Sequence, residues 1–390
     1  RSGEFWVIFL FFLSFFAGNC ASSTGVCAEP QRHRAGGLVA SAAAGSTTSG
    51  NPVCLRSPRT ALQVALLARG GAKRRAKRVV DDSSLHFLSV GDWGGLPIWP
   101  FTTPGQIAVA ETMGKIAAKF RSKFALSVGD HFYFSGVSSV DDPRWRRSFE
   151  NVYTARSLRR AKFWRPVLGN HDYDGNATAQ LLYPKKHWHF PSAQYSWRET
   201  LEDDGRTTVD FVMLDTILLC GPDSAVDRKV KGAEKAWRWV EAALAGSDAD
   251  YLVVSGHYPV WSPSSHGPTR CLVRRLQPLL TAAKASVYFS GHDHCLFHVG
   301  ARGGTQFHGV GAGFTASHST KNRNRIPPDQ PLKFHWGGSM KRPFNALSGG
   351  FVGASVRADA LTITHYDSLG AVLYSSRVPP RAREPACAPS

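Results

Sequence analysis

Five short apolar segments of this chain each end in a glycine that is followed by a side chain able to bind a metal ion. The side chains after these glycines are Asp92, Asp130, Asn170 with His171, His257, and His292 with Asp293 and His294. Such apolar runs predict strands buried on both faces, and glycine permits the sharp turn by which the chain leaves the sheet. Because open α/β sheets bind ligands at the carboxyl ends of their strands, we expect these side chains to meet there. Five such strand ends predict a metal site.

The segment Ser127–Gly136 adds a phenol to this set, because Tyr133 follows Asp130 by three residues. Carboxylate and phenolate oxygens suit a trivalent ion such as Fe(III), whereas imidazoles and an amide suit a divalent ion such as Fe(II), Zn or Mn. The ligand types therefore predict two metals of different kinds. A free tyrosine has a pKa of about 10, so only a strong positive charge nearby would ionise Tyr133. The alternative is an aromatic core residue, like Phe132 and Phe134 beside it.

The elements that must position these residues are strands that alternate with helices. A cap and first-turn pair at Thr103-Pro104 precedes apolar residues at helical spacing up to Phe120, and a second helical pattern extends from Ala233 to Leu244. This alternation predicts an α/β fold with both faces of the sheet covered by helices. Later apolar runs, which suggest a second sheet, occupy residues 208–215, 351–356 and 361–367. We therefore expect a two-sheet β-sandwich flanked by helices, with a dinuclear metal site at the strand carboxyl ends.

The metal-competent residues resemble, in the same order along the chain, the metal motifs of purple acid phosphatases within the calcineurin-like metallophosphoesterases. The small, tartrate-resistant type is the most similar. Four segments carry most of the resemblance: Gly91–Gly95, Phe132–Val137, Gly256–Ser262 and His266–Thr269. The resemblance extends from Leu85 to Arg377, and Tyr133 is the residue that narrows it to this family.

The resemblance implies a role for each of these residues. It implies that Asp92, Tyr133 and His294 bind Fe(III), that Asn170, His257 and His292 bind the divalent metal, and that Asp130 bridges the two. With a bound hydroxide the site would keep one positive charge toward a phosphate monoester, which the hydroxide would attack in line. His171 and His266 match histidines that are not ligands in the family, and we expect them to bind phosphate and to protonate the leaving group, respectively.

Seven cysteines, an odd number, give no disulfide framework by themselves. The resemblance implies that Cys220 pairs with Cys271, whereas Cys295 is expected to pack as a small hydrophobic residue. The sequon that begins at Asn176 predicts a glycan in a surface loop, provided that the chain is secreted.

The chain departs from the family pattern in three places. His131 stands where the family commonly has Asn, and Tyr173 stands where mammalian members have His. The segment 221–235 is shorter than the loop that mammalian members cleave during activation, so the resemblance does not carry regulation by cleavage over to this chain. The basic stretch 321–342 matches no motif, and it either attracts anionic substrates or forms a solvated face.

The first 80 residues have a composition unlike the rest. Residues 1–23 form a signal-like hydrophobic leader, in which residues 5–17 are almost wholly apolar but too few to span a bilayer. Residues 24–80 are basic and poor in acids, so that residues 1–80 carry a net +9, half of the formal charge of +18. They predict a disordered leader or propeptide, or a transit-like sequence, rather than a nucleic-acid-binding arm.

We expect a catalytic domain at 81–380 and a tail at 381–390. The leader predicts entry into the secretory pathway, to a secreted, vacuolar or lysosome-like location, with an organelle as the alternative. Cleavage near Ala21 and cleavage near Val79, after the dibasic residues 75–78, are both compatible with the sequence. The mature protein should have no stable transmembrane span and no nucleic-acid partner, and we expect a monomer.

The sequence thus predicts an acid phosphatase that hydrolyses phosphate monoesters at a Fe(III)–M(II) centre. One alternative is a general dinuclear metallophosphoesterase, such as a phosphodiesterase or nucleotidase, that uses two divalent ions and in which Tyr133 is a bystander. The other is a secreted binding protein on the same fold, which should have lost ligands, whereas here none is missing.

Overall fold

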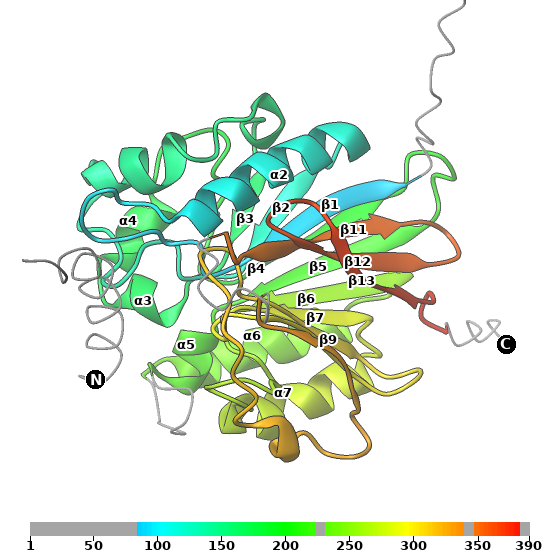
Figure 1. The fold of residues 1–390 in the computed structure, drawn as a ribbon. Coiled ribbons are helices and arrows are strands. Elements are labelled where there is room, and N and C mark those ends of the chain that lie inside the picture. Colours follow the sequence, from blue (N-terminus) through cyan, green and yellow to red (C-terminus); the bar gives the residue numbers. More distant parts are fainter. Residues whose placement is uncertain (1–83, 223–230, 339–346, 383–390) are drawn as a thin grey trace, which may run out of the picture. The chain divides into compact units, whose positions relative to one another are not determined.

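The computed structural model describes residues 84–222, 231–338 and 347–382, coloured by sequence in Figure 1. The predicted leader (1–23 and 24–80) and most of the tail at 381–390 lie outside the described residues. So do parts of the segments 221–235 and 321–342.

Two mixed β-sheets form the centre of the described part (Figure 1). The first sheet has the order β13-β12-β11-β1-β2-β3 and consists of β1 (Leu85–Val90), β2 (Phe124–Ser127), β3 (Trp164–Pro166), β11 (Gly350–Val356), β12 (Leu361–Asp367) and β13 (Val372–Val378). The second has the order β10-β8-β9-β7-β6-β5-β4 and consists of β4 (Tyr195–Thr200), β5 (Thr208–Leu214), β6 (Tyr251–Gly256), β7 (Val287–Ser290), β8 (Leu296–Val299), β9 (Gln306–Val310) and β10 (Leu332–Trp336). In both sheets the strands that precede the predicted ligands are parallel neighbours: β1, β2 and β3 in one, β6 and β7 in the other.

Helices cover both outer sides of these strands, with α2 on one side and α6 and α7 on the other (Figure 1). The helices are α2 (Pro104–Phe120), α3 (Asn170–Tyr173), α4 (Ala177–Leu181), α5 (Thr216–Cys220), α6 (Ala233–Ala245) and α7 (Arg270–Ala282), with short turns η1 (Trp145–Glu150), η2 (Arg156–Leu158) and η3 (Arg323–Arg325). Helix α2 begins where the sequence predicts, because the Thr103 side chain accepts a hydrogen bond from the Gln106 N–H at 3.1 Å. None of the helices in these described ranges is long and apolar enough to cross a membrane.

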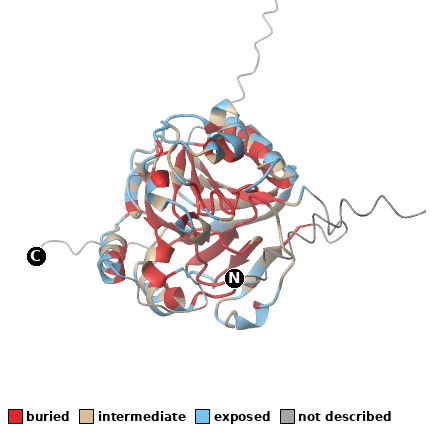
Figure 2. Cartoon of the chain, turned by 90° about the vertical axis from the view of Figure 1, so that its left-hand side faces the viewer, coloured by how far each residue is buried: buried red, intermediate tan, exposed pale blue. Residues whose placement is uncertain are grey.

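One core cluster lies between the two sheets, and a second packs the other face of β5 and β6 against α6 and α7; Figure 2 shows the buried residues in red. Phe87 and Phe124 of the first sheet meet Phe211 of the second edge to face, with ring centroids 5.2 and 5.1 Å apart. Strands β2, β6 and β7 are buried at every position, which is why they read as continuous apolar runs rather than alternating ones.

The predicted sandwich with flanking helices is confirmed, but its sheets are composed differently from the expectation. The later runs do not form a sheet of their own, because 208–214 lies in β5 beside β6, whereas β11 and β12 extend the sheet of β1. The pairing of Leu85 with Val356 joins residues far apart in the chain, and a local apolar pattern carries no information on such a partner. The carboxyl ends of β1, β2 and β3 therefore face those of β6 and β7 across the sandwich.

Candidate metal centre

Glycines at the strand ends let neighbouring segments pack closely around the carboxylates of the site. The Asp92 N–H donates to the Gly129 carbonyl at 3.0 Å, and the Gly291 N–H donates to the His257 carbonyl at 2.9 Å. A Cβ on Gly291 would lie 2.3 Å from the Asp92 carboxylate, and one on Gly169 would lie 2.1 Å from that of Asp130. Any side chain at these glycines would therefore occupy the space that the two carboxylates need.

One group of ligand atoms gathers around the phenol of Tyr133. Its hydroxyl oxygen lies 2.8 Å from the His294 Nε2 and 3.2 Å from the Asp92 Oδ1. The His294 Nε2 and the Asp92 Oδ1 are 3.5 Å apart. Tyr133 and Asp92 are almost fully buried and the His294 side chain is 30% exposed, so the three predicted Fe(III) ligands form one compact group that solvent reaches only on the side of His294.

The second group gathers around His257. Its Nε2 lies 3.0 Å from the Asn170 Oδ1 and 3.4 Å from the Asp130 Oδ2. Ligand atoms of Asp130, His257 and His292 all lie within 4.8 Å of one another. Helix α3 begins at Asn170, which turns its amide toward the end of β6, and Asp130 at the end of β2 lies beside this group, as a bridging carboxylate would.

The spacing of these atoms fits bound metal ions. Adjacent ligands about 2.1 Å from an octahedral ion lie about 3 Å apart, and the contacts in the two groups range from 2.8 to 3.5 Å. Two carboxylates, three imidazoles, an amide and a phenol offer the oxygen and nitrogen donors that iron, zinc and manganese bind. Buried carboxylates without a cation are costly, so cations would also remove an electrostatic penalty.

The pKa shifts of the buried groups show that cost. Burial, followed by the negative charge of Asp92, raises the pKa of the Tyr133 phenol well above its usual value. Burial likewise raises the pKa of Asp92. Burial, followed by the neighbouring His266, lowers the pKa of His292 well below 6.5, so that this imidazole is neutral, which is the form that binds a metal.

Hydrogen bonds from the backbone fix the orientation of the ligands. The His257 Nδ1 donates to the Val128 carbonyl at 2.9 Å, which directs Nε2 toward the site. The Asp92 carboxylate accepts the His292 N–H at 2.9 Å, which ties β1 to the end of β7. Both Asp92 and His292 have positive φ angles, of 57° and 69°, so the chain turns sharply at these ligands.

His171 and His266 flank this cluster without belonging to either ligand group. The His171 N–H donates to the Asp130 Oδ1 at 3.1 Å, and its Nδ1 donates to the Phe134 carbonyl at 2.7 Å. The His266 ring lies 4.0 Å from the His292 ring, measured between centroids. Both side chains are partly exposed, unlike His257, so both can reach a substrate.

Two carboxylates beside the ligands were not predicted from the sequence. Asp172 is fully buried, and its oxygens accept N–H groups of Gly169, Asp130 and His131 and the amide of Gln180 at 2.8 to 3.0 Å. Asp293 accepts the N–H of His266 at 3.0 Å and that of Gly267 at 3.2 Å. Each stands directly beside a predicted site histidine in sequence, and that adjacency was the available signal.

The departures from the family pattern have defined places. The His131 Nδ1 lies 2.8 Å from the Gln180 Oε1, so this residue belongs to the Asp172 network rather than to the ligands. The Tyr173 hydroxyl donates to the Asp215 carboxylate at 2.5 Å. Asp215 also accepts the Leu218 N–H at 2.9 Å and thereby caps α5.

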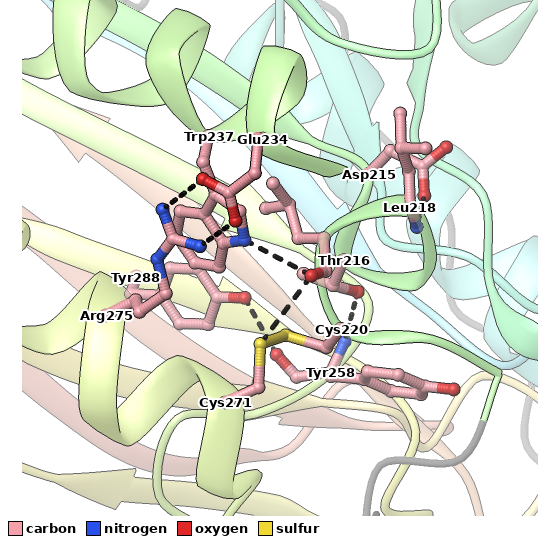
Figure 3. The surroundings of a disulfide bond; sticks show 11 residues. Asp215, Thr216, Leu218, Cys220, Glu234, Trp237, Tyr258, Cys271, Arg275 and Tyr288 are labelled. Carbon is pink, nitrogen blue, oxygen red and sulfur yellow. Dashed lines mark hydrogen bonds and ion pairs between the residues drawn. A yellow bond between two sulfur atoms is a disulfide. The ribbon is translucent and has the colours of Figure 1, made fainter. Parts of the chain in front are cut away.

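The disulfide between Cys220 and Cys271 is present, with Cα atoms 5.7 Å apart, and joins α5 to α7 (Figure 3). Cys295 is a buried free thiol in the hydrophobic cluster of the second sheet, as expected. Asn176 is exposed and caps α4, and its Nδ2 donates to the Ser138 carbonyl at 3.2 Å. Glycosylation of Asn176 stays a prediction.

Comparison with known proteins identifies the family of the chain. The family model described as calcineurin-like phosphoesterase matches residues 85–296. The chain is 39% identical over 309 residues to tartrate-resistant acid phosphatase type 5 of Oryctolagus cuniculus, covering 77% of this chain and 92% of that protein. It is 37% identical over 309 residues to the Homo sapiens protein of the same name, with the same coverage. It is 33% identical over 322 residues to purple acid phosphatase 7 of Arabidopsis thaliana, covering 77% of this chain and 88% of that one.

Solved structures show the same fold at lower identity. The Plasmodium protein GAP50, described as the anchor in the inner membrane complex, superposes with a TM-score of 0.65 at 24% identity, covering 77% of this chain and 90% of that one. Purple acid phosphatase PPD1 from Lupinus luteus seeds superposes with a TM-score of 0.55 at 15% identity, covering 76% and 54%. The chain belongs to the calcineurin-like phosphoesterases and, within them, to the purple acid phosphatases that include the tartrate-resistant type.

Proposed function

We propose that this protein is an acid phosphatase that hydrolyses phosphate monoesters at a Fe(III)–M(II) centre, where M is Fe, Zn or Mn. The observation that carries the proposal is the cluster itself. Seven donor residues from both sheets gather at one edge, five of them buried and two, Asn170 and His294, partly exposed, and two partly exposed histidines flank them. The names of the most similar relatives, tartrate-resistant and purple acid phosphatases, support the same activity.

Each residue has a proposed task. Asp92, Tyr133 and His294 would hold Fe(III), Asn170, His257 and His292 would hold the divalent ion, and Asp130 would contact both. When bound, the ions would supply positive charge for the phosphate and activate water for attack on phosphorus. The backbone bonds to His257 and His292 keep these side chains in place during turnover.

His171 is the proposed phosphate-binding residue. Because its Nδ1 donates to the Phe134 carbonyl at 2.7 Å, only Nε2 is left for the substrate. Although burial opposes it, the carboxylate of Asp130 and then the Phe134 carbonyl raise the pKa of His171. At acidic pH the ring is therefore a cation whose Nε2–H can donate to a phosphate oxygen.

His266 is the proposed proton donor for the leaving group. Its N–H is held by Asp293, and its ring lies against that of His292, at the edge of the divalent-metal group. As the bond from phosphorus to the leaving oxygen breaks, a proton from His266 would neutralise that oxygen. This help matters for alkyl alcohols, which leave poorly, and hardly for nitrophenol.

The visible spectrum of the full chain, purified from a secretory host with its metals, tests the metal assignment. We expect two metals per chain and a phenolate-to-Fe(III) band that Tyr133→Phe removes. Tyr183→Phe is a matched control, because the Tyr183 hydroxyl donates to Glu150, outside the cluster. A colourless protein with two divalent ions and diesterase activity would instead support a general metallophosphoesterase.

A second test separates the roles of the two histidines. His266→Ala should reduce kcat for an alkyl phosphate about 100-fold and leave kcat for nitrophenyl phosphate nearly unchanged. His171→Ala should raise KM for both substrates. Equal loss of kcat on both substrates in His266→Ala would remove the proton-donor role.

The finer expectations on processing belong to the same proposal. The disulfide supports folding in an oxidising compartment, and hence the secretory pathway. N-terminal sequencing of the mature protein distinguishes a start near Ala21 from one near Val79, and thereby tests the proposed domain limits of 81–380. Light scattering of the same sample tests whether the protein is a monomer.

A further inference from the structure

The basic stretch that follows β9 is attached to the segment that carries His266. The Ser317 N–H donates to the carbonyl of His294 at 2.6 Å. Further along, the Asn322 side-chain amide donates to the carbonyls of Ser264 and Ser265 at 2.6 and 3.0 Å. In Figure 1 this stretch is the orange segment that runs from the site edge toward α7.

A small open pocket of about 200 Å³ lies where this stretch meets the start of α7. Its wall consists of Trp261, Pro268, Arg270, Val273, Arg274 and Arg325. Complete small-molecule sites usually have volumes of about 300–1,000 Å³, so this pocket suits a single phosphate, sulfate or carboxylate group. Half of the wall residues are arginines, whose planar guanidinium groups bind phosphate oxygens in pairs.

The surroundings of the pocket favour an anion. No acidic residue belongs to its described wall, and no acidic residue lies in the first turn of α7. Arg275 on the same helix pairs with Glu234 at 2.6 Å, whereas Arg270 has no ion-pair partner among the described residues. The positive end of the α7 dipole adds to the positive charge of these arginines. The side chain of Thr269 at the N-cap makes no capping bond, so it does not satisfy the N–H groups of the first turn.

A second observation, independent of charge, concerns the wall residue Trp261. This indole is 8% exposed, and its Nε1 has no hydrogen-bond partner within the part of the chain that the structure describes. A buried N–H without a partner is costly, and Trp261 therefore brings an unmet hydrogen-bond donor to the residues that line the pocket.

We propose that this pocket is an anion-binding subsite that takes a phosphate group other than the one that is hydrolysed. The subsite adjoins the segment of the proposed proton donor, since Pro268 follows His266 by two residues. Arg325 also donates to the Asn322 Oδ1 at 3.1 Å, and Asn322 holds the carbonyls just before His266. The group is either a second phosphate on the substrate or a free anion, and the substrate form rests on the proposed function.

Two measurements on the full-length metal-loaded protein test this subsite. The variants are Arg270→Gln, Arg325→Gln and their combination, with Arg302→Gln, an exposed arginine in the turn after β8, as the matched control. The first measurement compares KM and kcat for a sugar monophosphate and the corresponding sugar bisphosphate. The second records the melting temperature in sodium sulfate and in sodium chloride of equal ionic strength, which needs no catalysis.

We expect sulfate to raise the melting temperature of the wild type more than chloride does, and the double variant to lose part of this gain. If the anion is a second phosphate of the substrate, the double variant raises KM for the bisphosphate about tenfold, with kcat and the monophosphate KM unchanged. If only the sulfate effect is lost, the anion is a free one.

The subsite is overturned if the double variant matches Arg302→Gln in bisphosphate KM and in the sulfate effect. Failure of the proposed function looks different, because the wild type would then hydrolyse neither sugar phosphate. In that case the melting experiment still decides on the pocket.

Discussion

The carboxylate of Asp172 accepts the backbone N–H of Asp130 at 2.9 Å, so a buried charge just outside the ligand set holds the proposed bridging residue in place. The same oxygen accepts the Gly169 N–H at 2.8 Å. The turn after β2 and the turn after β3 therefore share one acceptor. The charge of this carboxylate matters as well, because Asp172 adds a negative charge next to the cations that the site would hold.

Replacing Asp172 by Ala should destabilise the fold and the metal site together. The change leaves four buried N–H groups without an acceptor, and we expect a loss of about 3–5 kcal/mol in the free energy of unfolding. Urea denaturation measures this loss, and metal analysis should show fewer than two ions per chain. Asp174→Ala, at an exposed position on the same turn, should change stability by less than about 0.5 kcal/mol.

The buried carboxylate of Asp215, which accepts the hydroxyl of the exposed Tyr173, makes stability depend on pH. Burial raises the pKa of Asp215 from 3.8 to about 6. The folded state therefore binds this proton more tightly than the unfolded chain does, and the free energy of unfolding falls as pH rises from about 4 to about 6, by up to about 3 kcal/mol. Asp215→Asn should flatten this part of the profile in urea denaturation, while Asp174→Asn should not.

Tyr173→Phe separates the phenol from the carboxylate in the same experiment. The Tyr173 hydroxyl lowers the pKa of Asp215 in opposition to burial, so its removal should extend the falling part of the profile to higher pH. An unchanged profile in both Asp215→Asn and Tyr173→Phe would mean that other groups set the pH dependence in this range.

Three buried histidines between the sheets should have the opposite effect to Asp215, because they make the free energy of unfolding rise with pH. His298 of β8 stacks on His308 of β9 with centroids 4.1 Å apart, and the His308 Nδ1 lies 2.9 Å from the His365 Nε2 of β12. Burial lowers the pKa of His298 to about 4 and that of His365 to about 3. Their contribution to stability is complete above pH 6.5 and is lost as pH falls toward these values.

His365→Gln should therefore make the protein less sensitive to acid. As pH falls from 6.5 to 4.5, the unfolded chain protonates this histidine while the folded protein keeps it neutral, which lowers the free energy of unfolding by up to about 3 kcal/mol. The variant lacks this histidine and should therefore lose clearly less stability over this range than the wild type. The melting temperature as a function of pH is the measurement. His318→Gln, outside this cluster, should keep the wild-type slope, and an equal slope in His365→Gln would contradict the prediction.

That the proposed ligands lie close together could be predicted from the sequence, because Asp92, Asp130, Asn170, His257 and His292 each follow a glycine at the end of a buried strand. Asp130 and Tyr133 illustrate this, since three residues of turn suffice to bring both to one edge. The partners of the ligands could not be predicted in this way. Gln180 reaches Asp172 across a short helix, and Asn322 reaches Ser264 over 58 positions, a contact that depends on the packing of two separate loops.

Which strands pair within each sheet could not be predicted from the sequence either. β11 is as apolar as β6, yet it joins β1 in antiparallel orientation, while β6 joins β5 in the other sheet. β6 is buried at every position and β11 at all but Gly353 and Ser355, so their apolar patterns are similar, and the tertiary contacts of the finished fold distinguish them. The resemblance to a family was therefore more informative about the site than about the sheet order.

Removal of the disulfide should cost stability without changing the chemistry. Cys220 and Cys271 are 51 residues apart, and the loop that they close corresponds to about 4 kcal/mol of unfolded-state entropy. The double Cys→Ser variant should show a lower melting temperature and the same visible spectrum. Reducing agent should lower the melting temperature of the wild type by opening this disulfide, and it should have no such effect on the double variant. Cys295→Ser changes a buried free thiol and leaves the disulfide intact, so this variant should respond to reducing agent as the wild type does.

Asn322 should affect the proposed proton donor without touching the substrate. Its amide donates to the carbonyls of Ser264 and Ser265, so Asn322→Ala leaves the segment before His266 less firmly held. We expect kcat for an alkyl phosphate to fall about tenfold, because a displaced donor loses its alignment with the leaving oxygen, whereas kcat for nitrophenyl phosphate should change less than about twofold. Asn324→Ala, two residues further on and exposed, is the matched control.

The dependence on leaving group is what distinguishes positioning from general damage. If Asn322→Ala lowered kcat equally for both substrates, the residue would act through the stability of the loop or the metals and not through His266. A spectrum and metal content identical to the wild type, together with a selective loss on the alkyl phosphate, would place the effect at the proton donor. Combining Asn322→Ala with His266→Ala should then add no further loss, because the residue that Asn322 positions is already absent.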